Sequence, residues 1–196
     1  MYTNHTNPIA LENQDKITRA LLEMMRQKPF DRVTVTEICR AAGLERMTFY
    51  RHFDEKVDVI RYYLDREMTR LLSSLPHQST LERNLTALFV WAQTERQGLS
   101  ALMDNHMTTL ITQSLHQSIF SLLSANLSEA DRRHMPASPY SGSDPYINGA
   151  VMGTILGMIT VWRMDDYRET PAELALRCLA IFGLFPKKAE LSELSQ

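Results

Sequence analysis

The sequence TVTEICRAAGLERMTFYRHFDEK, which spans residues 34–56, decides the fold. Thr34 and Glu37 have the spacing of a capping box, in which the threonine oxygen and the glutamate carboxylate each satisfy a free backbone amide at a helix start. A short helix is therefore predicted over residues 34–42, and the glycine that follows ends it. A second short helix is predicted over residues 45–52. Two short helices joined by a glycine-containing turn predict helix-turn-helix geometry.

The two sides of this segment predict different roles. The apolar side chains are expected to pack against an earlier helix, and they are Ile38, Ala41 or Ala42, Leu44, Phe49 and Phe53. The opposite face of the second short helix is expected to stay in water, and it presents Arg46, Met47, Thr48, Tyr50 and Arg51. An arginine, a hydroxyl and a phenol on one exposed helix suit hydrogen bonds to base edges and phosphates. The segment therefore predicts a nucleic-acid-binding surface.

The composition favours an all-α protein. Leucine and methionine together number 36 and valine and isoleucine 17, and unbranched side chains keep more rotamer freedom in a helix than β-branched ones. Apolar spacing predicts further helices over residues 12–27, 54–75, 81–97, 99–126 with a break near 104–107, 145–163 and 171–182. Prolines, glycine and serines predict a flexible exposed loop at about 128–144. We expect about nine helices in total.

Charge and cysteine content exclude several classes of protein. The net charge is −2, so the chain is no polycation, and Cys39 and Cys178 are too few for a disulfide framework. Residues 1–13 lack the cationic start and apolar block of a secretory signal, so we expect a cytoplasmic protein. Residues 145–162 carry no formal charge, but they fall short of the roughly 20 apolar residues that cross a bilayer, so no membrane contact is expected.

Residues 17–60 resemble the DNA-binding region of TetR-family transcriptional regulators, most specifically in the motif TFYRHFxxK that ends at Lys56. The resemblance implies a bacterial homodimer whose recognition helix enters the major groove of a double-stranded, pseudo-palindromic operator. It also implies a helix-turn-helix domain over residues 1–56 and a helical domain for ligand binding and dimerisation over 57–196. The later run YINGAVMGTILGMITVW, followed by TPAEL, is similar to one C-terminal subtype of the family.

The resemblance assigns DNA contacts residue by residue. Thr34 and Thr36 would touch phosphate, Arg46, Met47 and Thr48 would face the groove floor, and Tyr50, His52 and Lys56 would hold the DNA backbone, with Arg51 beside them. Two positions depart from the family pattern, because Glu45 replaces a common serine and Met47 replaces a small residue. Glu45 can favour the positive helix end or accept from a cytosine amino group, and Met47 can contact a thymine methyl group.

A ridge of glycines predicts a subunit contact. Gly149, Gly153 and Gly157 recur every four residues, which lets another backbone approach closely, either within the same domain or across the two-fold axis of a dimer. We favour the dimer, because the helix predicted at 171–182 supplies a second apolar face and two-fold pairing is the commonest oligomeric arrangement. The other predicted interface residues are Ile155, Ile159, Leu174, Leu179 and Phe182.

A small-molecule pocket is expected among the central helices, with Trp91, Met103, His106, Met107, Phe120 and Met152 as candidates. A mostly apolar cavity with a few polar groups suits a small effector. The alternative is ordinary core packing, because methionine fills gaps and aromatic residues at helical spacing usually pack inward. The histidine spacing fits no zinc site, and no catalytic or phosphate-binding motif occurs, so we expect neither a metal nor a cofactor nor catalysis.

Three functions follow in order of preference. The first is a sequence-specific DNA-binding regulator, a repressor that a small apolar effector releases from DNA by shifting the central helices. The second is a co-regulator that binds DNA but takes its signal from a protein partner and has no small-molecule pocket. The third is an enzyme built on a helical domain, for which the sequence offers no nucleophile or base.

Overall fold

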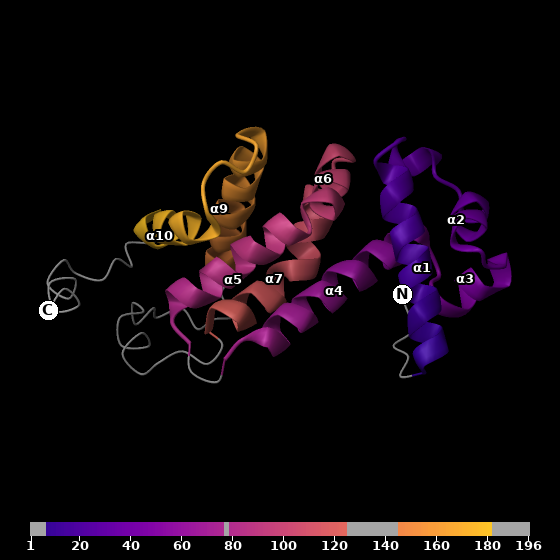
Figure 1. Ribbon diagram of the computed structural model, residues 1–196, viewed down its shortest axis with the longest axis horizontal. Coiled ribbons are helices and arrows are strands. Elements are labelled where there is room, and N and C mark those ends of the chain that lie inside the picture. The colour runs from indigo at the N-terminus through magenta and orange to yellow at the C-terminus, as the bar shows by residue number, and fades with distance from the viewer. Residues whose placement is uncertain (1–6, 77–78, 125–144, 182–196) are drawn as a thin grey trace, which may run out of the picture. The chain divides into compact units, whose positions relative to one another are not determined.

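The computed structural model describes residues 7–76, 79–124 and 145–181, which form nine α-helices and one short 3₁₀ helix and contain no β-strand (Figure 1). The helices are α1 (Pro8–Met25), η1 (Phe30–Arg32), α2 (Val35–Ala42), α3 (Arg46–His52), α4 (Lys56–Ser74), α5 (Leu81–Thr94), α6 (Arg96–Asp104), α7 (Thr108–Ser124), α9 (Pro145–Met164) and α10 (Pro171–Ile181). The all-α prediction is confirmed. The loop predicted at about 128–144 lies outside the described residues.

The chain divides into two compact units. Unit 1 comprises Met1–Arg70 and Glu95–Ser118, and unit 2 comprises Leu71–Thr94 and Ile119–Gln196. Unit 1 therefore holds α1, α2, α3 and α6 with most of α4, and unit 2 holds α5, α9 and α10. The predicted domain boundary at residue 56 stays a prediction. Among the described helices, none combines the length and the hydrophobicity that a bilayer crossing requires.

Helix α1 begins at Pro8, earlier than the predicted residue 12. The side chain of Asn7 accepts a hydrogen bond from the Ile9 amide at 2.9 Å, and a proline at the first helical position has no N–H that needs a partner. Ile17 and Leu21 on the inner side of α1 are both 0% exposed. Helix α1 therefore offers a continuous apolar face to its neighbours.

The predicted helix-turn-helix is present, with α2 and α3 packed against α1 (Figure 1). Ile38, Phe49 and Phe53 are at most 1% exposed and form its core. Ala41 is exposed and Leu44 is half-buried, so their predicted part in the core is smaller. Because the inner side chains of α3 are fixed in this core, the outer ones are held at a fixed angle.

Helix α6 packs closely on α4 within unit 1. The Tyr63 hydroxyl donates to Glu95 Oε2 at 2.7 Å, and Tyr63 is buried. Burial and the hydrogen bond to Glu95 raise the pKa of Tyr63 above its ordinary value. A Cβ added at Gly98 would collide with the Tyr63 hydroxyl. A glycine at this position therefore allows the close approach of the two helices.

The predicted break near residues 104–107 is confirmed, because α6 ends at Asp104 and α7 begins at Thr108. His106 has a φ of 57°, in the left-handed region that commonly ends a helix. The Met107 amide then donates to the Leu102 carbonyl at 3.0 Å, which closes the end of α6. The turn between the two helices is thus defined by its own backbone hydrogen bonds.

In unit 2, α9 has one buried face and one open face. Buried side chains on α9 are Met152, Ile155, Leu156, Ile159 and Trp162. A row of exposed residues at intervals of three or four positions runs along α9, with the exposed Ala150 beside it, and its members are Tyr146, Gly149, Gly153, Gly157, Val161 and Met164. These two sets lie on opposite sides of one helix because a helix turns through 3.6 residues.

Helix α10 packs against α5 and α9. The Trp162 ring meets the Phe89 ring edge-on, with centroids 6.2 Å apart, and the Tyr167 ring at 4.9 Å. The Trp162 indole N–H donates to the Glu169 carbonyl at 2.9 Å. Thr170 and Glu173 form a capping box that starts α10. These contacts fix the turn between α9 and α10.

Candidate nucleic-acid interface

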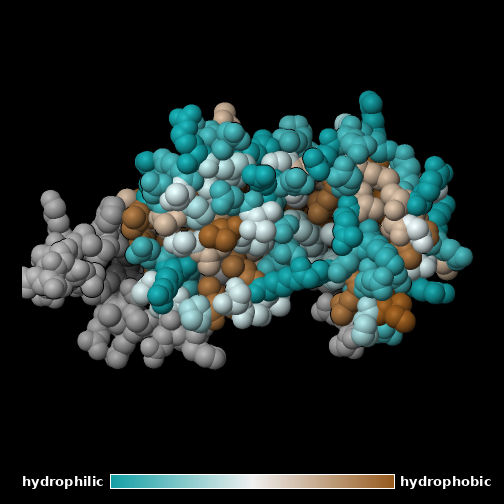
Figure 2. Space-filling model, in the orientation of Figure 1, coloured by the Kyte–Doolittle hydropathy of each residue, from teal (hydrophilic) through white to brown (hydrophobic). Residues whose placement is uncertain are grey.

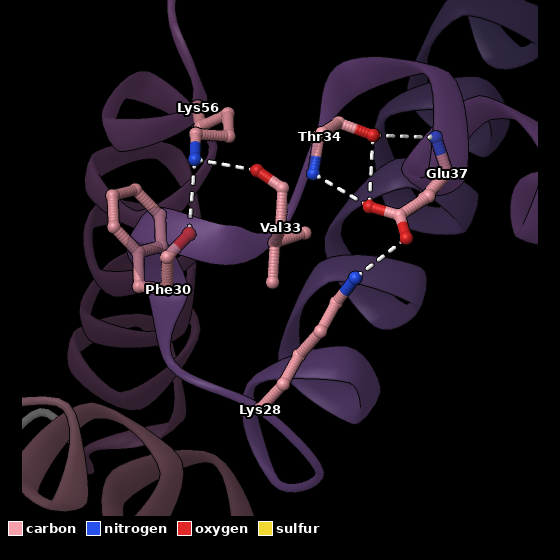
Figure 3. Close-up of polar contacts among 6 residues, drawn as sticks. All are labelled: Lys28, Phe30, Val33, Thr34, Glu37 and Lys56. Carbon is pink, nitrogen blue, oxygen red and sulfur yellow. Dashed lines mark hydrogen bonds and ion pairs between the residues drawn. The ribbon is translucent and has the colours of Figure 1, made fainter.

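The start of α2 is fixed by the predicted capping box, which Figure 3 shows. Thr34 Oγ1 accepts from the Glu37 N–H at 3.3 Å, and the Thr34 N–H donates to Glu37 Oε2 at 2.9 Å. Lys28 Nζ donates to the other carboxylate oxygen at 2.6 Å. The Lys28 hydrogen bond, followed by those from Thr34, lowers the pKa of Glu37 to about 2.

The lowered pKa of Glu37 predicts a pH-dependent contribution to stability. Because the pKa is lower in the folded chain than in the unfolded one, the ionised carboxylate stabilises the fold above about pH 4.5, and this contribution is lost as the pH falls towards about 2. We expect Glu37→Gln to lower the melting temperature at pH 7 and to have little effect near pH 2. Thermal unfolding of both proteins across a pH series measures this difference.

The control for this prediction is Glu45→Gln. Glu45 is the N-cap of α3 and makes no side-chain hydrogen bond to the helix. The two substitutions remove the same charge near a helix start, but only Glu37→Gln removes a carboxylate that pairs with Lys28 and accepts hydrogen bonds from Thr34. A difference between wild type and Glu37→Gln that stays constant from pH 7 to pH 2 would contradict the prediction.

The turn between α2 and α3 depends on a glycine. Gly43 has a φ of 67°, where a side chain is strained, and its N–H donates to the Arg40 carbonyl at 3.3 Å. The Leu44 N–H donates to the Cys39 carbonyl at 2.9 Å. The turn therefore provides hydrogen-bond donors for two carbonyls at the end of α2. It leads into α3 within three residues.

The outer face of α3 carries the residues that the sequence assigns to base and phosphate contacts. Met47 is 64% exposed and Tyr50 is 46% exposed. Arg46 and Arg51 are exposed, and Thr48 is half-buried. The predicted exposure of this face is therefore confirmed for four of its five residues. Their contacts with DNA stay a prediction.

Arg46 is held in a defined position over Tyr50. Its Nη2 donates to the Tyr50 hydroxyl at 3.3 Å, and its guanidinium carbon lies 5.8 Å from the centre of the Tyr50 ring. The Tyr50 ring in turn meets the buried Phe49 ring edge-on at 5.4 Å. A guanidinium has five N–H donors, so this arrangement orients Arg46 and leaves donors for a base edge or a phosphate.

The surface over α1, α2 and α3 is largely hydrophilic, with hydrophobic residues between the polar ones (Figure 2). The exposed Met47 is one such residue on the outer face of α3. From residue 40 to residue 56 the chain has four arginines and lysines against three acidic residues. General attraction to phosphate is therefore modest, because it grows with the number of phosphates that are neutralised.

Two residues predicted to hold the DNA backbone face the protein instead. Lys56 Nζ donates to the carbonyls of Phe30 at 2.9 Å and Val33 at 2.5 Å, and it lies 4.4 Å from the centre of the Phe30 ring (Figure 3). His52 is 6% exposed and packs on Phe53. A phosphate contact by His52 would require the ring to leave this position, so we omit it from the proposed interface.

The two threonines at α2 lie at the surface. Thr36 is exposed. Thr34 is also exposed, but its hydroxyl both accepts from the Glu37 amide and donates to the Glu37 carboxylate. A phosphate contact by Thr34 would therefore compete with the cap, whereas Thr36 is accessible.

The predicted pocket residues fall in both units. Trp91 and Met152 are buried in unit 2. Met103, His106 and Met107 lie in unit 1, where His106 is exposed and, with Met107, borders a surface groove of about 410 Å³. The side chain of Phe120 lies outside those that the structure describes. A single pocket formed by these residues stays a prediction.

The predicted dimer residues divide into an open set and a buried set. A Cβ added at Gly149, Gly153 or Gly157 would meet no atom of another described segment within 4 Å. Beside the last two glycines runs a groove of about 690 Å³, which also includes Val161 and Ile181 in its lining.

The other predicted interface residues form the core of unit 2. Ile155, Ile159, Leu174 and Leu179 are between 1% and 6% exposed in the single chain. Packing of α9 and α10 within the chain already covers these side chains, and their part in a dimer interface stays a prediction. Phe182 lies outside the described residues.

Sequence reasoning missed Asn105, which contacts α1, α6 and the turn before α2. Its side chain donates to the Met25 and Ala101 carbonyls at 3.0 and 2.8 Å and accepts from the Phe30 amide at 2.6 Å. Phe30 and Asn105 are 75 positions apart in the sequence. No local spacing or capping signal links residues at that separation.

Residues 17–63 match the family model described as bacterial regulatory proteins, tetR family. No curated protein sequence matches the chain. Among solved structures, the chain is similar to the fatty acid degradation regulator FadR from Bacillus halodurans, with a TM-score of 0.63, 18% identity, and coverage of 94% of this chain and 99% of that one. At this identity the likeness shows a shared fold.

Two further structures show the same fold. A tetR-family transcriptional regulator from Streptomyces coelicolor has a TM-score of 0.54 and 20% identity, with coverage of 86% of this chain and 80% of that one. The dihydroxyacetone kinase operon activator DhaS has a TM-score of 0.54 and 12% identity, with coverage of 86% and 93%.

Proposed function

We propose that this chain, a DNA-binding transcriptional regulator with the tetR-family domain at residues 17–63, acts as a homodimeric repressor that recognises a pseudo-palindromic operator through α3. The observation that carries the proposal is the outer face of α3. Arg46, Met47 and Tyr50 are exposed on this face, while Phe49 and Phe53 anchor the helix from behind. Donors and a hydrophobic side chain on a rigid exposed helix suit base edges in a major groove.

Base contacts are assigned to Arg46 and Met47, and phosphate contacts to Thr36, Tyr50 and Arg51. Arg46 is the residue best placed to read a guanine, because a guanidinium pairs with two acceptors of that base and Tyr50 already orients it. Met47 suits a thymine methyl group. Thr36 and Arg51 are exposed beside them and can reach the flanking phosphates.

Dimerisation supplies the second recognition helix. The charge balance around α3 is close to even, so one copy neutralises few phosphates and two copies double the contacts. Two recognition helices fit successive major grooves when they lie about 34–36 Å apart. The glycine ridge of α9 supports a two-fold contact, because no side chain among the described residues lies where a partner helix would approach it.

Binding to DNA can be tested with duplexes selected from a random-sequence library by the full-length protein. We expect enrichment of an inverted repeat, and affinity for it that falls with salt but exceeds the affinity for unrelated duplexes at every salt concentration. Equal binding to all duplexes would contradict the proposed function.

The proposed effector is a small, mostly apolar molecule that carries a hydrogen-bond acceptor. Trp91 is 8% exposed, and among the described residues no acceptor lies within hydrogen-bond distance of its indole N–H. A buried donor without a partner is costly, and a ligand oxygen would satisfy it. Thermal-shift screening against apolar acids, esters and ketones tests this, and we expect stabilisation that Trp91→Phe abolishes.

A substitution on the glycine ridge tests the dimer contact. We expect Gly153→Leu to convert the dimer to a monomer, because the leucine would occupy the space of the partner helix. The described part of the chain leaves room for it, since no atom of another described segment lies within 4 Å of the added Cβ, and leucine favours a helix more than glycine does. Light scattering gives the molar mass of each variant.

The matched control is Gln113→Leu, which adds an exposed leucine to the part of α7 that belongs to unit 1. We expect this variant to keep the molar mass of the wild-type protein. Circular dichroism establishes that both variants remain helical. A Gly153→Leu protein that stays dimeric would place the subunit contact elsewhere.

A further inference from the structure

The backbone of Phe30 is held from both sides by side chains from distant parts of unit 1. Its N–H donates to Asn105 Oδ1 at 2.6 Å, and its carbonyl accepts from Lys56 Nζ at 2.9 Å. Asn105 follows the last residue of α6, and Lys56 is the first residue of α4. One residue of the short helix η1 therefore connects two long helices. We refer to Phe30, Asn105 and Lys56 as the Phe30 clamp.

Asn105 uses both its donors and its acceptor in the clamp. Its Nδ2 donates to the Ala101 carbonyl within α6 and to the carbonyl of Met25, the last residue of α1. The left-handed backbone of His106 turns the chain immediately after it, which keeps Asn105 at the tip of the α6–α7 turn. Because of these hydrogen bonds, a shift of Asn105 would displace both the end of α1 and η1.

Lys56 extends the clamp to the start of α2. Its second hydrogen bond goes to the carbonyl of Val33, the residue before the N-cap Thr34 (Figure 3). Val33 is 1% exposed, so this carbonyl belongs to a well-packed part of the chain. The capping box at Thr34 then fixes where α2 begins. The Phe30 clamp therefore holds the carbonyl of Val33, and the capping box holds the next residue, Thr34, immediately before α2 in the sequence.

We propose that Asn105 and Lys56 are positioning residues for DNA binding, which hold the Phe30–Arg32 turn and so set the angle at which α2 and α3 are presented. The inference rests on the proposed function. It assigns to Lys56 a structural role in place of a phosphate contact. It also identifies a route by which movement at the end of α6 reaches α2, through a side chain that contacts neither DNA nor effector.

The test compares Asn105→Ala with Gln97→Ala in the full-length protein. Gln97 on α6 also contacts α1, by accepting from Arg26 at 3.3 Å, but makes no hydrogen bond to the turn. We expect Asn105→Ala to lower the affinity for the selected operator about tenfold, from the loss of several hydrogen bonds that fix the turn. Affinity for an unrelated duplex stays unchanged, and Gln97→Ala behaves as the wild-type protein.

Two further readouts separate positioning from general destabilisation. All affinities are measured well below the melting temperature of each variant, so that the protein is folded. Under these conditions a loss of global stability alone leaves the ratio of specific to non-specific affinity unchanged. Hydrogen exchange gives the second readout, and we expect faster exchange at residues 30–37 in Asn105→Ala but not in Gln97→Ala. An unchanged ratio or unchanged exchange at these residues would overturn the role of Asn105.

Lys56→Met distinguishes the clamp from a phosphate contact. Methionine keeps an apolar stem against Phe30 but removes every donor. If Lys56 positions the turn, affinity falls by a similar factor at all salt concentrations. If it binds phosphate, the slope of log affinity against log salt becomes shallower by about 0.9 per subunit, and this result would overturn the role of Lys56.

The wild-type measurement separates failure of the clamp from failure of the proposed function. A wild-type protein that prefers no duplex contradicts the proposed function and this inference with it. A wild-type protein that binds its operator, together with an Asn105→Ala variant of unchanged specificity, overturns the clamp alone.

Discussion

Arg46→Ala is expected to weaken binding to the selected operator by about 100-fold, because a bidentate arginine–guanine pair contributes about ten- to a hundredfold in discrimination and each dimer has two. Arg46 is exposed and makes its hydrogen bond only on the surface, to the Tyr50 hydroxyl. The substitution therefore leaves the core of the helix-turn-helix intact. Fluorescence anisotropy with a labelled operator at fixed salt measures the change.

The control for this experiment is Arg83→Ala, which removes an exposed arginine from α5 in unit 2. We expect its operator affinity and melting temperature to match those of the wild-type protein. Repeating the selection with Arg46→Ala gives a second test, since the guanine read by Arg46 should lose its preference at one position in each half-site. Retention of the same consensus and the same affinity would show that α3 does not read the operator through Arg46.

Phe53→Ala is expected to lower the free energy of unfolding by about 3–5 kcal/mol, the range found for phenylalanine truncation in protein cores. Phe53 is 1% exposed. Its ring packs on Phe49 and Tyr62, with centroid distances of 5.7 Å to each. Removing the ring leaves a cavity at the junction of α1, α3 and α4, and such a loss is a large part of the stability of a typical domain. Urea denaturation measures it.

Tyr50→Ala is the matched control, because it removes an aromatic ring from the exposed face of the same helix. Tyr50 is 46% exposed, so we expect a loss of stability below about 1 kcal/mol. The comparison separates the two faces of α3 by their roles. Equal losses for Tyr50→Ala and Phe53→Ala would contradict the division into an inner, structural face and an outer, binding face.

The parts of the fold that depend on neighbouring residues could be predicted from the sequence. The capping box of Thr34 and Glu37 involves residues three apart, and Gly43 ends α2 within the same segment. The break between α6 and α7, at residues 104–107, likewise lies within one short segment of the sequence. The start of α1 was predicted too late because Asn7 and Pro8, which are local signals, were overlooked.

Contacts between distant segments could not be predicted. The family resemblance assigns a phosphate contact to Lys56, yet its ammonium group meets two backbone carbonyls 26 and 23 positions earlier in the chain. The burial of His52 also depends on tertiary packing. Helical periodicity places His52 between the inner and outer faces of α3, and contacts with other segments determine whether its side chain is buried or exposed. Asn105 belongs to no sequence motif that would have predicted its contacts. Such contacts depend on tertiary packing, which single-sequence periodicity does not specify.

The dimer contact predicted on α9 could be specified only in part from the sequence. Apolar periodicity identified α9 as a helix with hydrophobic residues on more than one side, but it could not decide which side meets α5 and α10 and which remains open. Ile155 and Gly157 are two positions apart, so they point in nearly opposite directions. The prediction assigns both residues to the dimer interface, but in the single chain only Gly157 lies on the open face of α9.

The separation of inner and outer residues on α3 has a consequence for engineering and for the evolution of binding specificity. Phe49 and Phe53 fix the helix, whereas Arg46, Met47 and Tyr50 contribute little to the core. On the proposed function, operator preference can therefore be changed at the two positions assigned to base contacts, Arg46 and Met47, while the scaffold stays unchanged. A small combinatorial library at these positions would sample new half-sites without the loss of folded protein that usually limits such libraries.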